Sequence, residues 1–167
     1  TAWKMAEAGA TVITIARDKE QLEATQREFE ANGHRLEAYV GDVTDFAQVD
    51  ALVQQIIADH GGVDILVNNA GRSIRRAVEN SFDRFHDYER TMQLNYFGAL
   101  RLTMGLLPKM IEKKSGHVIN ISSIGVLTNA PRFSAYVASK AAMDAWTRCA
   151  ASEFADRGIN FTTINMP

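Results

Sequence analysis

The stretch Thr11-Val12-Ile13-Thr14-Ile15-Ala16 decides the fold class, because it is the first of several short apolar runs separated by helical patterns. Five of its six residues are β-branched, a composition typical of a strand buried on both faces. Asp18 follows at a position suited to cap a helix, predicted over residues 19–31. Asn32-Gly33 then provides a helix stop. The stretch therefore predicts one strand-plus-helix unit.

The same alternation continues to the end of the chain. Further strands are predicted at residues 35–40, 63–67, 117–121 and 159–164, and helices at residues 2–8, 44–60, 82–88, 91–114 and 134–156. We expect an irregularity between the helical segments 82–88 and 91–114. No hairpin signal separates the strands, so they should form a parallel sheet wrapped by helices on both faces. Residues 1–167 are therefore predicted to form a single doubly wound α/β domain.

Composition and charge exclude several classes of protein. The net charge of −2 offers no electrostatic footprint for nucleic acid. No apolar run approaches the ~20 residues that span a bilayer, so no transmembrane segment is predicted. Cys149 is the only cysteine, which we expect to pack in a helix, and a reducing cytoplasmic setting fits best. The four histidines are scattered without the spacing of metal ligands, so no metal site is predicted.

Tyr136 and Lys140 form a candidate proton-transfer pair. They are four residues apart in a helical segment, so their side chains can converge on one face. A nearby ammonium favours the phenolate, which would lower the pKa of the phenol and make it a usable acid near neutral pH. The hydroxyl of Ser123 could bind a substrate oxygen beside the phenol. Together the three side chains indicate protonation or deprotonation of an oxygen.

Ser123, Tyr136-x-x-x-Lys140, the run Asn68-Asn69-Ala70-Gly71 and Asn95 together resemble the short-chain dehydrogenase/reductase family. The resemblance covers essentially the whole chain and implies a Rossmann-like fold with strand order 3-2-1-4-5-6. By that order, residues 11–16 are the second strand. The first strand and its Gly-rich loop, and the elements after Pro167, are expected to lie outside this chain.

The ends of the chain agree with this expectation. Thr1 stands at the start of a predicted helix, and Pro167 directly follows a predicted strand. We therefore expect a piece of a longer protein. The first strand would lie in the middle of the sheet, between residues 11–16 and 63–67. The 167 residues alone are accordingly expected to be inactive.

The resemblance also implies a nicotinamide cofactor. At the end of the first visible strand, NAD-preferring enzymes carry an acidic residue that binds the ribose 2′-hydroxyl. Arg17 stands there instead and can pair with a 2′-phosphate, so NADP(H) is preferred over NAD(H). Alternatively, Arg17 is a solvated loop charge. By resemblance, Asp42 binds the adenine ring and Val43 packs against it, although Asp42 could instead cap the next helix. Thr44 is expected to provide that cap.

The remaining site residues follow from the same resemblance. Asn68 is expected to hold the sheet, and the run Asn69-Ala70-Gly71 to line the cofactor. Tyr136 acts as general acid or base, while Lys140 also holds the nicotinamide ribose. Ser123 polarises the carbonyl oxygen, and Ser122 supports the loop. Asn95, which departs from helix propensity, holds a water in a proton relay and marks a local irregularity.

The loop after Gly71 narrows the substrate. Its arginines Arg72, Arg75 and Arg76, with Asp87-Tyr88-Glu89-Arg90 and Asn95-Tyr96-Phe97-Gly98, resemble the reductase domains of bacterial fatty acyl-CoA reductases. The arginines could meet phosphates of coenzyme A or of the cofactor, or form a solvated basic loop. The prediction is hydride transfer between NADP(H) and a carbonyl or alcohol, including acyl-CoA or fatty aldehyde reduction.

Two further expectations concern the whole protein. A catalytically silent dinucleotide-binding module is the alternative to an enzyme, although such a module has no use for a matched proton-donor set. By resemblance, the whole protein should form a homodimer or homotetramer through the long helices that begin near Thr91 and Ser134.

Overall fold

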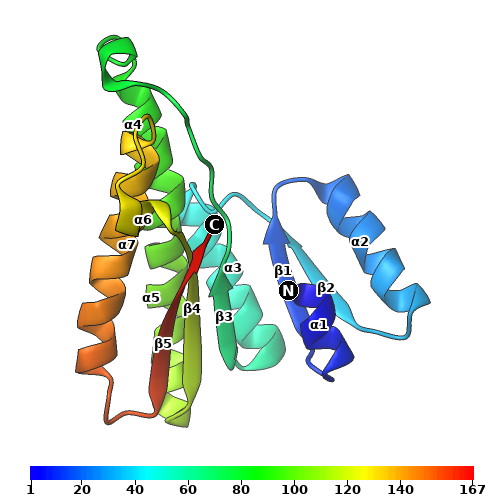
Figure 1. Ribbon diagram of the computed structural model, residues 1–167. Helices are drawn as coiled ribbons and strands as arrows, with labels where there is room; N and C mark the ends of the chain where they lie inside the picture. The colour runs from blue at the N-terminus through cyan, green and yellow to red at the C-terminus, as the bar shows by residue number, and fades with distance from the viewer.

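A parallel β-sheet divided into two parts forms the centre of the fold, seen in a computed structural model of residues 1–167 (Figure 1). The strands are β1 (Val12–Ala16), β2 (Leu36–Val40), β3 (Ile65–Asn68), β4 (Gly116–Ser123) and β5 (Ile159–Met166). β1 pairs with β2, and β4 pairs with both β3 and β5, always in parallel. β1 and β3 do not pair, so the sheet is split where the resemblance places another strand. The Rossmann-like parallel fold is confirmed.

The first helices form where the capping residues predict them. α1 spans Ala2–Glu7, and α2 spans Lys19–Ala31. The carboxylate of Asp18 accepts a hydrogen bond from the backbone N–H of Gln21 at 3.0 Å, which caps α2 as expected. Both helices pack beside β1 and β2, on the far side of these strands from the other helices (Figure 1).

The next helix begins two residues later than predicted. α3 spans Phe46–His60, and its cap is Asp45, whose side chain accepts from the backbone N–H groups of Ala47 and Gln48. The prediction that Thr44 caps this helix is wrong. A carboxylate is as good a cap as a hydroxyl, and Asp45 is one residue nearer to the first helical turn.

The longest helical region is continuous, which corrects the predicted break. α4 (Phe85–Met92), the π-helical segment η2 (Gln93–Gly98) and α5 (Ala99–Lys113) follow one another without a loop. The irregularity expected between residues 88 and 91 is therefore absent. The irregularity lies in η2 instead, around Asn95, as the low helix propensity of asparagine predicted.

Two short elements were not predicted, and the last strands are longer than expected. η1 (Val78–Asn80) and α6 (Gly125–Thr128) are single turns inside loops. β4 reaches Ser123 and therefore includes both serines. α7 spans Ser134–Glu153, and Cys149 is exposed on it, so the expectation that this thiol is packed is wrong.

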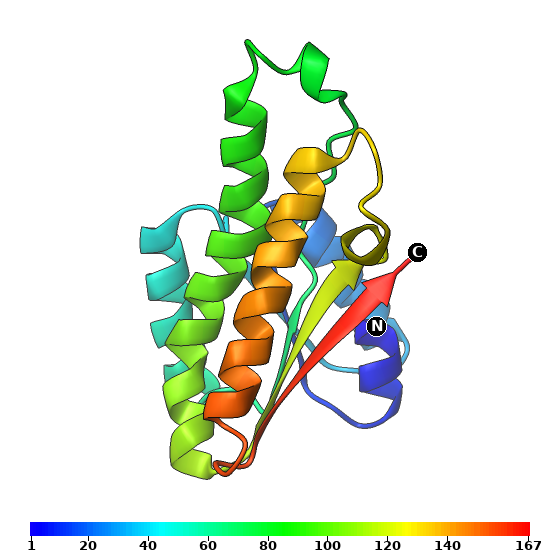
Figure 2. The same cartoon turned by 60° about the vertical axis from the view of Figure 1, so that its left-hand side comes forward.

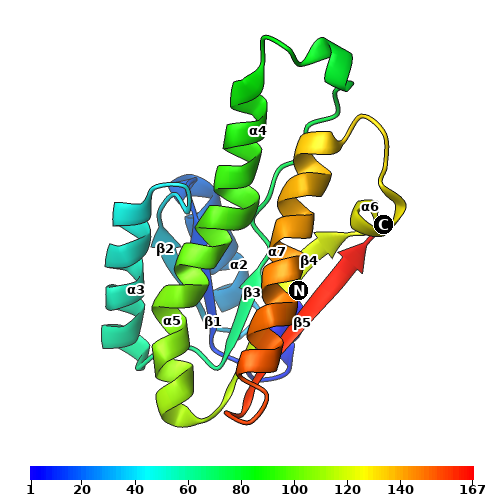
Figure 3. The ribbon, with the colours of Figure 1, turned by 90° about the vertical axis from the view of Figure 1, so that its left-hand side faces the viewer.

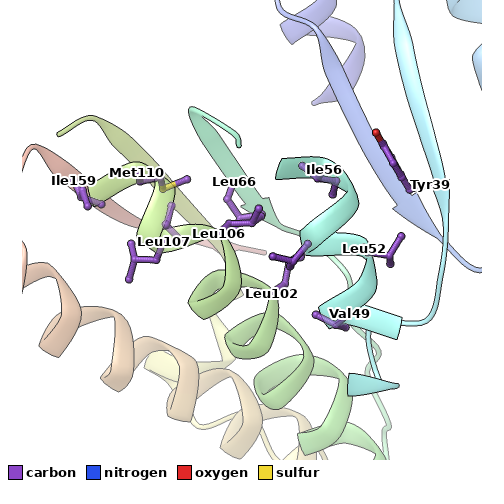
Figure 4. Packing of buried hydrophobic residues seen from close by; sticks show 12 residues of the cluster. Tyr39, Val49, Leu52, Ile56, Leu66, Leu102, Leu106, Leu107, Met110 and Ile159 are labelled. Atoms are coloured by element: carbon purple, nitrogen blue, oxygen red, sulfur yellow. The ribbon is translucent and has the colours of Figure 1, made fainter. Parts of the chain in front are cut away.

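The helices α3, α5 and α7 lie side by side as one layer against the sheet (Figures 2 and 3). Between this layer and the strands lies the main core of twelve buried residues, which includes Val49, Ile56, Leu106, Met110 and Val118 (Figure 4). A second cluster of four buried residues joins α1, β1, α2 and β2: Ala6, Val12, Phe29 and Leu36. None of the helices has the length and apolar character needed to cross a membrane.

Candidate active site

Three of the four predicted catalytic residues come from the carboxyl end of β4 and the first turns of α7, and the fourth, Asn95, comes from η2. Ser123 is the last residue of β4, and its hydroxyl accepts a hydrogen bond from the backbone N–H of Gly125 at 3.1 Å. A Cβ atom on Gly125 would lie 3.3 Å from both Ser123 Oγ and Val137 Cγ2. The serine is thus close to the turn of α7 that carries Tyr136.

Lys140 is buried, with 6% of its surface exposed. Its ammonium donates a hydrogen bond to the backbone carbonyl of Ile121 on β4 at 2.6 Å. Burial disfavours the charged form and lowers the pKa of Lys140 below its ordinary value. The lysine side chain therefore ties α7 to β4.

Tyr136 is half-buried, and none of the chain's hydrogen bonds uses its hydroxyl. Its ring makes an edge contact with Phe133, with ring centroids 6.5 Å apart. The only polar group of the side chain is thus available to a ligand. By contrast, Ser122 Oγ is buried without a hydrogen-bond partner, so this serine does not support the loop by a hydrogen bond.

Asn95 connects three segments of the site. Its Oδ1 accepts from the backbone N–H of Arg72, while its Nδ2 donates to the Arg72 carbonyl and to Ser139 Oγ, each at 2.9 Å. A Cβ atom on Gly71 would lie 3.3 Å from Asn95 Oδ1 and 3.4 Å from Lys140 Nζ. Only a very small residue at position 71 lets the loop approach both groups this closely.

Ser139 is a site residue that the sequence interpretation missed. It is fully buried, it donates to the carbonyl of Tyr136 at 2.7 Å, and it accepts from Asn95. Its hydroxyl therefore ties the turn that carries Tyr136 to η2. The available signal was its place inside Tyr136-x-x-x-Lys140, on the inner side of a helix.

A chain of buried amides and hydroxyls supports the site from below. Asn68 Nδ2 donates to Asn120 Oδ1 at 2.8 Å and to Thr103 Oγ1 at 2.9 Å. Asn120 in turn donates to Thr147 Oγ1 at 2.8 Å. These bonds join β3, β4, α5 and α7, so the expectation that Asn68 holds the sheet is confirmed.

The residues predicted for the adenine side lie at the edge of the smaller sheet. Asp42 Oδ1 accepts from the backbone N–H and the hydroxyl of Thr44 at 2.8 and 2.7 Å, and its Oδ2 lies 3.5 Å from Arg17 Nη1. Burial alone would raise the pKa of Asp42, but the Thr44 hydrogen bonds and the Arg17 charge outweigh it and lower that pKa. Val43 packs partly on the main core.

A cavity of about 660 Å³ opens between this edge and α4. It is lined by Arg17, Thr44, Gly71, Arg72, Glu89, Arg90, Gln93 and Leu94. Three guanidinium groups against one carboxylate make the lining favourable for an anion. Asn69 and Ala70 lead from β3 into the loop at its border.

The three arginines after Gly71 do not act as one cluster. Arg72 lines the cavity, and Arg75 is exposed without an ion pair. Arg76 instead faces Asp87, with Nε 3.3 Å from Oδ2. The hydrogen bond from Arg84, together with the charges of His86 and Arg76, keeps the pKa of Asp87 below its ordinary value. Arg76 is therefore paired within the chain, whereas Arg72 lines the cavity.

The parallel sheet, Ser123 and the Tyr136–Lys140 helix are the features from which membership of the short-chain dehydrogenase/reductase family was predicted. Residues 1–167 match the family described as short chain dehydrogenase, and the chain belongs to this family.

Relatives of known name agree with this assignment. The chain is 57% identical to a fatty acyl-CoA reductase of Acinetobacter baylyi over 164 residues, which is 98% of this chain and 56% of the relative. A short-chain dehydrogenase from Streptomyces avermitilis has a similar structure, with a TM-score of 0.90 and 40% identity over 98% of this chain and 59% of the other. A metagenomic short-chain oxidoreductase in complex with NADP gives a TM-score of 0.91 and 30% identity, covering 98% of this chain and 74% of the other. The predicted resemblance to fatty acyl-CoA reductases is confirmed, and the chain spans about half the length of the curated relatives it matches.

Proposed function

We propose that the chain carries the cofactor-binding and proton-transfer residues of an NADP(H)-dependent oxidoreductase. The reaction is hydride transfer between nicotinamide and a carbonyl or alcohol carbon. One observation carries the proposal: the Tyr136 hydroxyl makes no hydrogen bond within the chain, and its helix turn is held by Ser139 and Asn95 and followed by the buried Lys140.

The residues present fit a dinucleotide. Gly71 lets the loop after β3 lie close to Asn95 and Lys140. Because the glycine has no side chain, a ribose could approach the backbone there. The cavity beside it has the volume of a nucleotide site and an excess of positive charge. Asn69, Ala70 and Gly71 would hold the ribose, while Asp42 and Val43 would hold the adenine. Hydride transfer is the chemistry that a bound nicotinamide supplies.

Arg17 is the proposed determinant of NADP(H) preference. It lies at the cavity wall with 75% of its side chain exposed, so its planar fork can turn from Asp42 to a 2′-phosphate. The Arg17–Asp42 distance is 3.5 Å and the pair is solvated, so breaking this ion pair to bind the phosphate costs little free energy. A phosphate carries more negative charge than a carboxylate, so Arg17 should bind the 2′-phosphate of the cofactor in preference to Asp42.

Tyr136 gives a proton to the substrate oxygen in reduction and takes one in oxidation. Negative charge develops on that oxygen as the carbon is reduced, so a donor within hydrogen-bond reach stabilises the transition state. Lys140 places a positive charge on the same helix face and would also bind the ribose hydroxyls. Both Nδ2 hydrogens of Asn95 are used within the chain, so a relay water would have to donate to its carbonyl oxygens.

Ser123 orients the substrate oxygen. Its hydroxyl accepts from Gly125 N–H, which leaves its own hydrogen free to donate to a carbonyl.

The surroundings of Ser123 support an apolar substrate. Ile124, Leu127 and Met166 are exposed apolar side chains, and the backbone bond from Ile124 N–H to the Met166 carbonyl, 2.8 Å long, holds α6 against β5. Such a surface suits an acyl chain, as in a fatty acyl-CoA or fatty aldehyde.

The decisive experiment measures NADPH oxidation by the whole protein with a panel of acyl-CoA, aldehyde and ketone substrates. We expect turnover with a long-chain aldehyde or acyl-CoA, and Tyr136→Phe should lower kcat by about 1,000-fold. Tyr96→Phe is the matched control, because the Tyr96 hydroxyl also makes no hydrogen bond yet lies outside the proposed machinery. Full activity in Tyr136→Phe would contradict the proton-donor assignment.

The whole protein is also proposed to form a homodimer or homotetramer through its long helices. Phe97 and Met104 are seven residues apart, which places them on one helix face, and both are exposed. Met104→Arg should weaken self-association in light scattering. An unchanged mass would place the interface elsewhere.

A further inference from the structure

Asp87 is a buried carboxylate that the proposed chemistry does not use. It lies in the first turn of α4, and only 6% of its surface is exposed. Two guanidinium groups and one imidazole face it: Arg84 Nε at 3.0 Å, Arg76 Nε at 3.3 Å and His86 Nε2 at 3.4 Å. This carboxylate therefore holds the loop of Arg76 against the start of α4.

From Arg76 the connection continues to the catalytic helix. The backbone N–H of Arg76 donates to the carbonyl of Arg132 at 2.7 Å. Arg132 has a φ of 70° and Asn129 a φ of 52°, a left-handed conformation that is unfavourable for an arginine and tolerated by an asparagine. The loop that enters α7 is thus strained, and such a conformation persists only when its surroundings fix it.

The first turn of α7 has no cap of its own. Phe133 precedes it, and its side chain offers no acceptor for the free N–H groups. Residues of α4 hold the first turn of α7 instead. The hydroxyls of Tyr88 and Ser134 lie 2.9 Å apart and form a hydrogen bond, and the ring of Phe85 stacks on Tyr88. Figure 3 shows α4 running beside the start of α7.

The space between these groups is closely packed. A void of only about 10 Å³ remains between the Arg76 loop, α4 and α7. It is lined by Ile74, Arg76, Ser81, Asp87, Tyr88, Ser134 and Ala135. Asp87 and Ala135 thus line the same small space, and Ala135 is the direct neighbour of Tyr136.

We infer that Asp87 is a positioning residue for Tyr136. Asp87 holds Arg76 and Arg84 by ion pairs, and the backbone of Arg76 in turn holds Arg132. The loop fixed in this way determines where the first turn of α7 lies. The inference rests on the proposed function, because it assigns Tyr136 the proton transfer. A displacement of about 1 Å at a reacting group costs about 100-fold in rate. Cofactor binding should be affected far less, since Arg17, Asp42 and Gly71 are held by other contacts.

The test compares Asp87→Asn with wild type in the whole protein. We expect kcat to fall about 100-fold, while the Kd for NADPH, followed by its fluorescence, changes by less than about threefold. Asp87→Glu, which keeps the charge, should recover at least about tenfold of the lost kcat. Asp83→Asn is the matched control, because Asp83 is an exposed acid on the same segment without an ion pair, and it should leave kcat unchanged.

Hydrogen–deuterium exchange gives a readout that needs no turnover. In Asp87→Asn the amides of residues 135–139 should exchange at least about tenfold faster, while those of β5 stay as in wild type. If Asp87→Asn does not fold, Arg84→Lys tests the same ion pair with the positive charge retained, and the amides of residues 135–139 should again exchange faster than in wild type. Wild-type kcat in Asp87→Asn, or unchanged exchange in residues 135–139, would overturn the inference. An inactive wild type would instead defeat the proposed function, and the exchange result alone would then decide on Asp87.

Discussion

The two parts of the divided sheet differ in how much they bury and in what they carry. The cluster of twelve buried residues covers β3, β4 and β5 and takes only Tyr39 from β2, whereas the cluster of four lies among α1, β1, α2 and β2. The proposed proton-transfer residues all stand on the larger part, and Arg17 and Asp42 stand at the edge of the smaller one. Groups that need fixed geometry therefore lie where packing is densest. Arg17, the proposed determinant of cofactor choice, lies where its side chain is 75% exposed.

The two parts meet in the main core, where Tyr39 of β2 is buried and Ile13 and Ile15 of β1 pack against the cluster, and at two further contacts. The hydroxyl of Tyr39 on β2 donates to Asp59 Oδ2 at 2.8 Å and lies 2.9 Å from His60 Nε2, both at the end of α3. In addition, η2 approaches the loop after β2 so closely that a Cβ on Gly98 would lie 2.5 Å from the Val43 carbonyl oxygen.

A matched pair of leucine substitutions tests the difference in packing most strongly. Leu106 and Leu36 are each 1% exposed, the first in the larger cluster and the second in the smaller. Leu106→Ala should lower the free energy of unfolding by about 4 kcal/mol, and Leu36→Ala by about 2.5 kcal/mol. Urea denaturation measures both. A larger loss in Leu36→Ala would mean that the small cluster is the better packed of the two.

The junction at η2 is tested by Gly98→Ala. The added methyl group meets a backbone oxygen that cannot move alone, so we expect a loss of about 2 kcal/mol in the free energy of unfolding. Gly105→Ala is the control in the same long helix, because its Cβ would meet only the side chain of Val53, at 2.8 Å. It should cost about 1 kcal/mol less. Equal thermal stability of the two variants would show that the Val43 contact is soft.

The exposed edge of the smaller part is tested by cofactor choice. Arg17→Asp in the whole protein should shift the ratio of kcat/KM for NADPH over NADH by at least about tenfold toward NADH, since a carboxylate repels a 2′-phosphate and can bind a 2′-hydroxyl. Arg35→Asp, on the same part but paired with Glu37, should leave the ratio unchanged. An unaltered ratio in Arg17→Asp would show that the phosphate is bound elsewhere.

The smallest effect concerns the Tyr39 junction and depends on pH. Burial, followed by the hydrogen bond to Asp59, raises the pKa of Tyr39 to about 12. The folded protein thus keeps the phenol protonated to a higher pH than the unfolded chain. Its contribution to stability is full below pH 10 and is lost as the pH rises toward 12. Tyr39→Phe should cost about 1 kcal/mol at neutral pH.

The pH series gives the control for this last prediction. Urea denaturation at pH 8 and at pH 11 should show that the difference between wild type and Tyr39→Phe shrinks at the higher pH. A constant difference would mean that the hydroxyl is not held between β2 and α3 as described.

The sequence predicted the strands well because each is a short apolar run with a turn on both sides. β1 and β2 begin within one residue of their predicted starts, whereas β4 and β5 extend two residues beyond their predicted ends. Capping was harder to predict, since Thr44 and Asp45 are both competent and only the position of the first turn decides between them. The single-turn helix α6 has too few residues to show a helical period.

The site could be predicted in its main residues but not in its connections. Ser123 and the Tyr136–Lys140 pair have a characteristic spacing, whereas the partner of Arg76 depends on how a loop folds back on α4. Ser139 looked like an ordinary helix residue, because its role exists only through Asn95, 44 residues away. Such long-range hydrogen bonds leave no local pattern in a sequence.

The π-helical segment η2 has a consequence for how this chain can change. An α-helix turns about 100° per residue, so the wider turn of η2 alters the rotational phase of α5 relative to α4. Asn95 faces Arg72 and Ser139, while Leu102, Leu106 and Met110 of α5 face the main core. Deleting one residue from 93–98 would restore a regular helix and rotate one of these two sets away from its partners. Insertions and deletions are therefore excluded from this segment, although single substitutions on its outer surface are not.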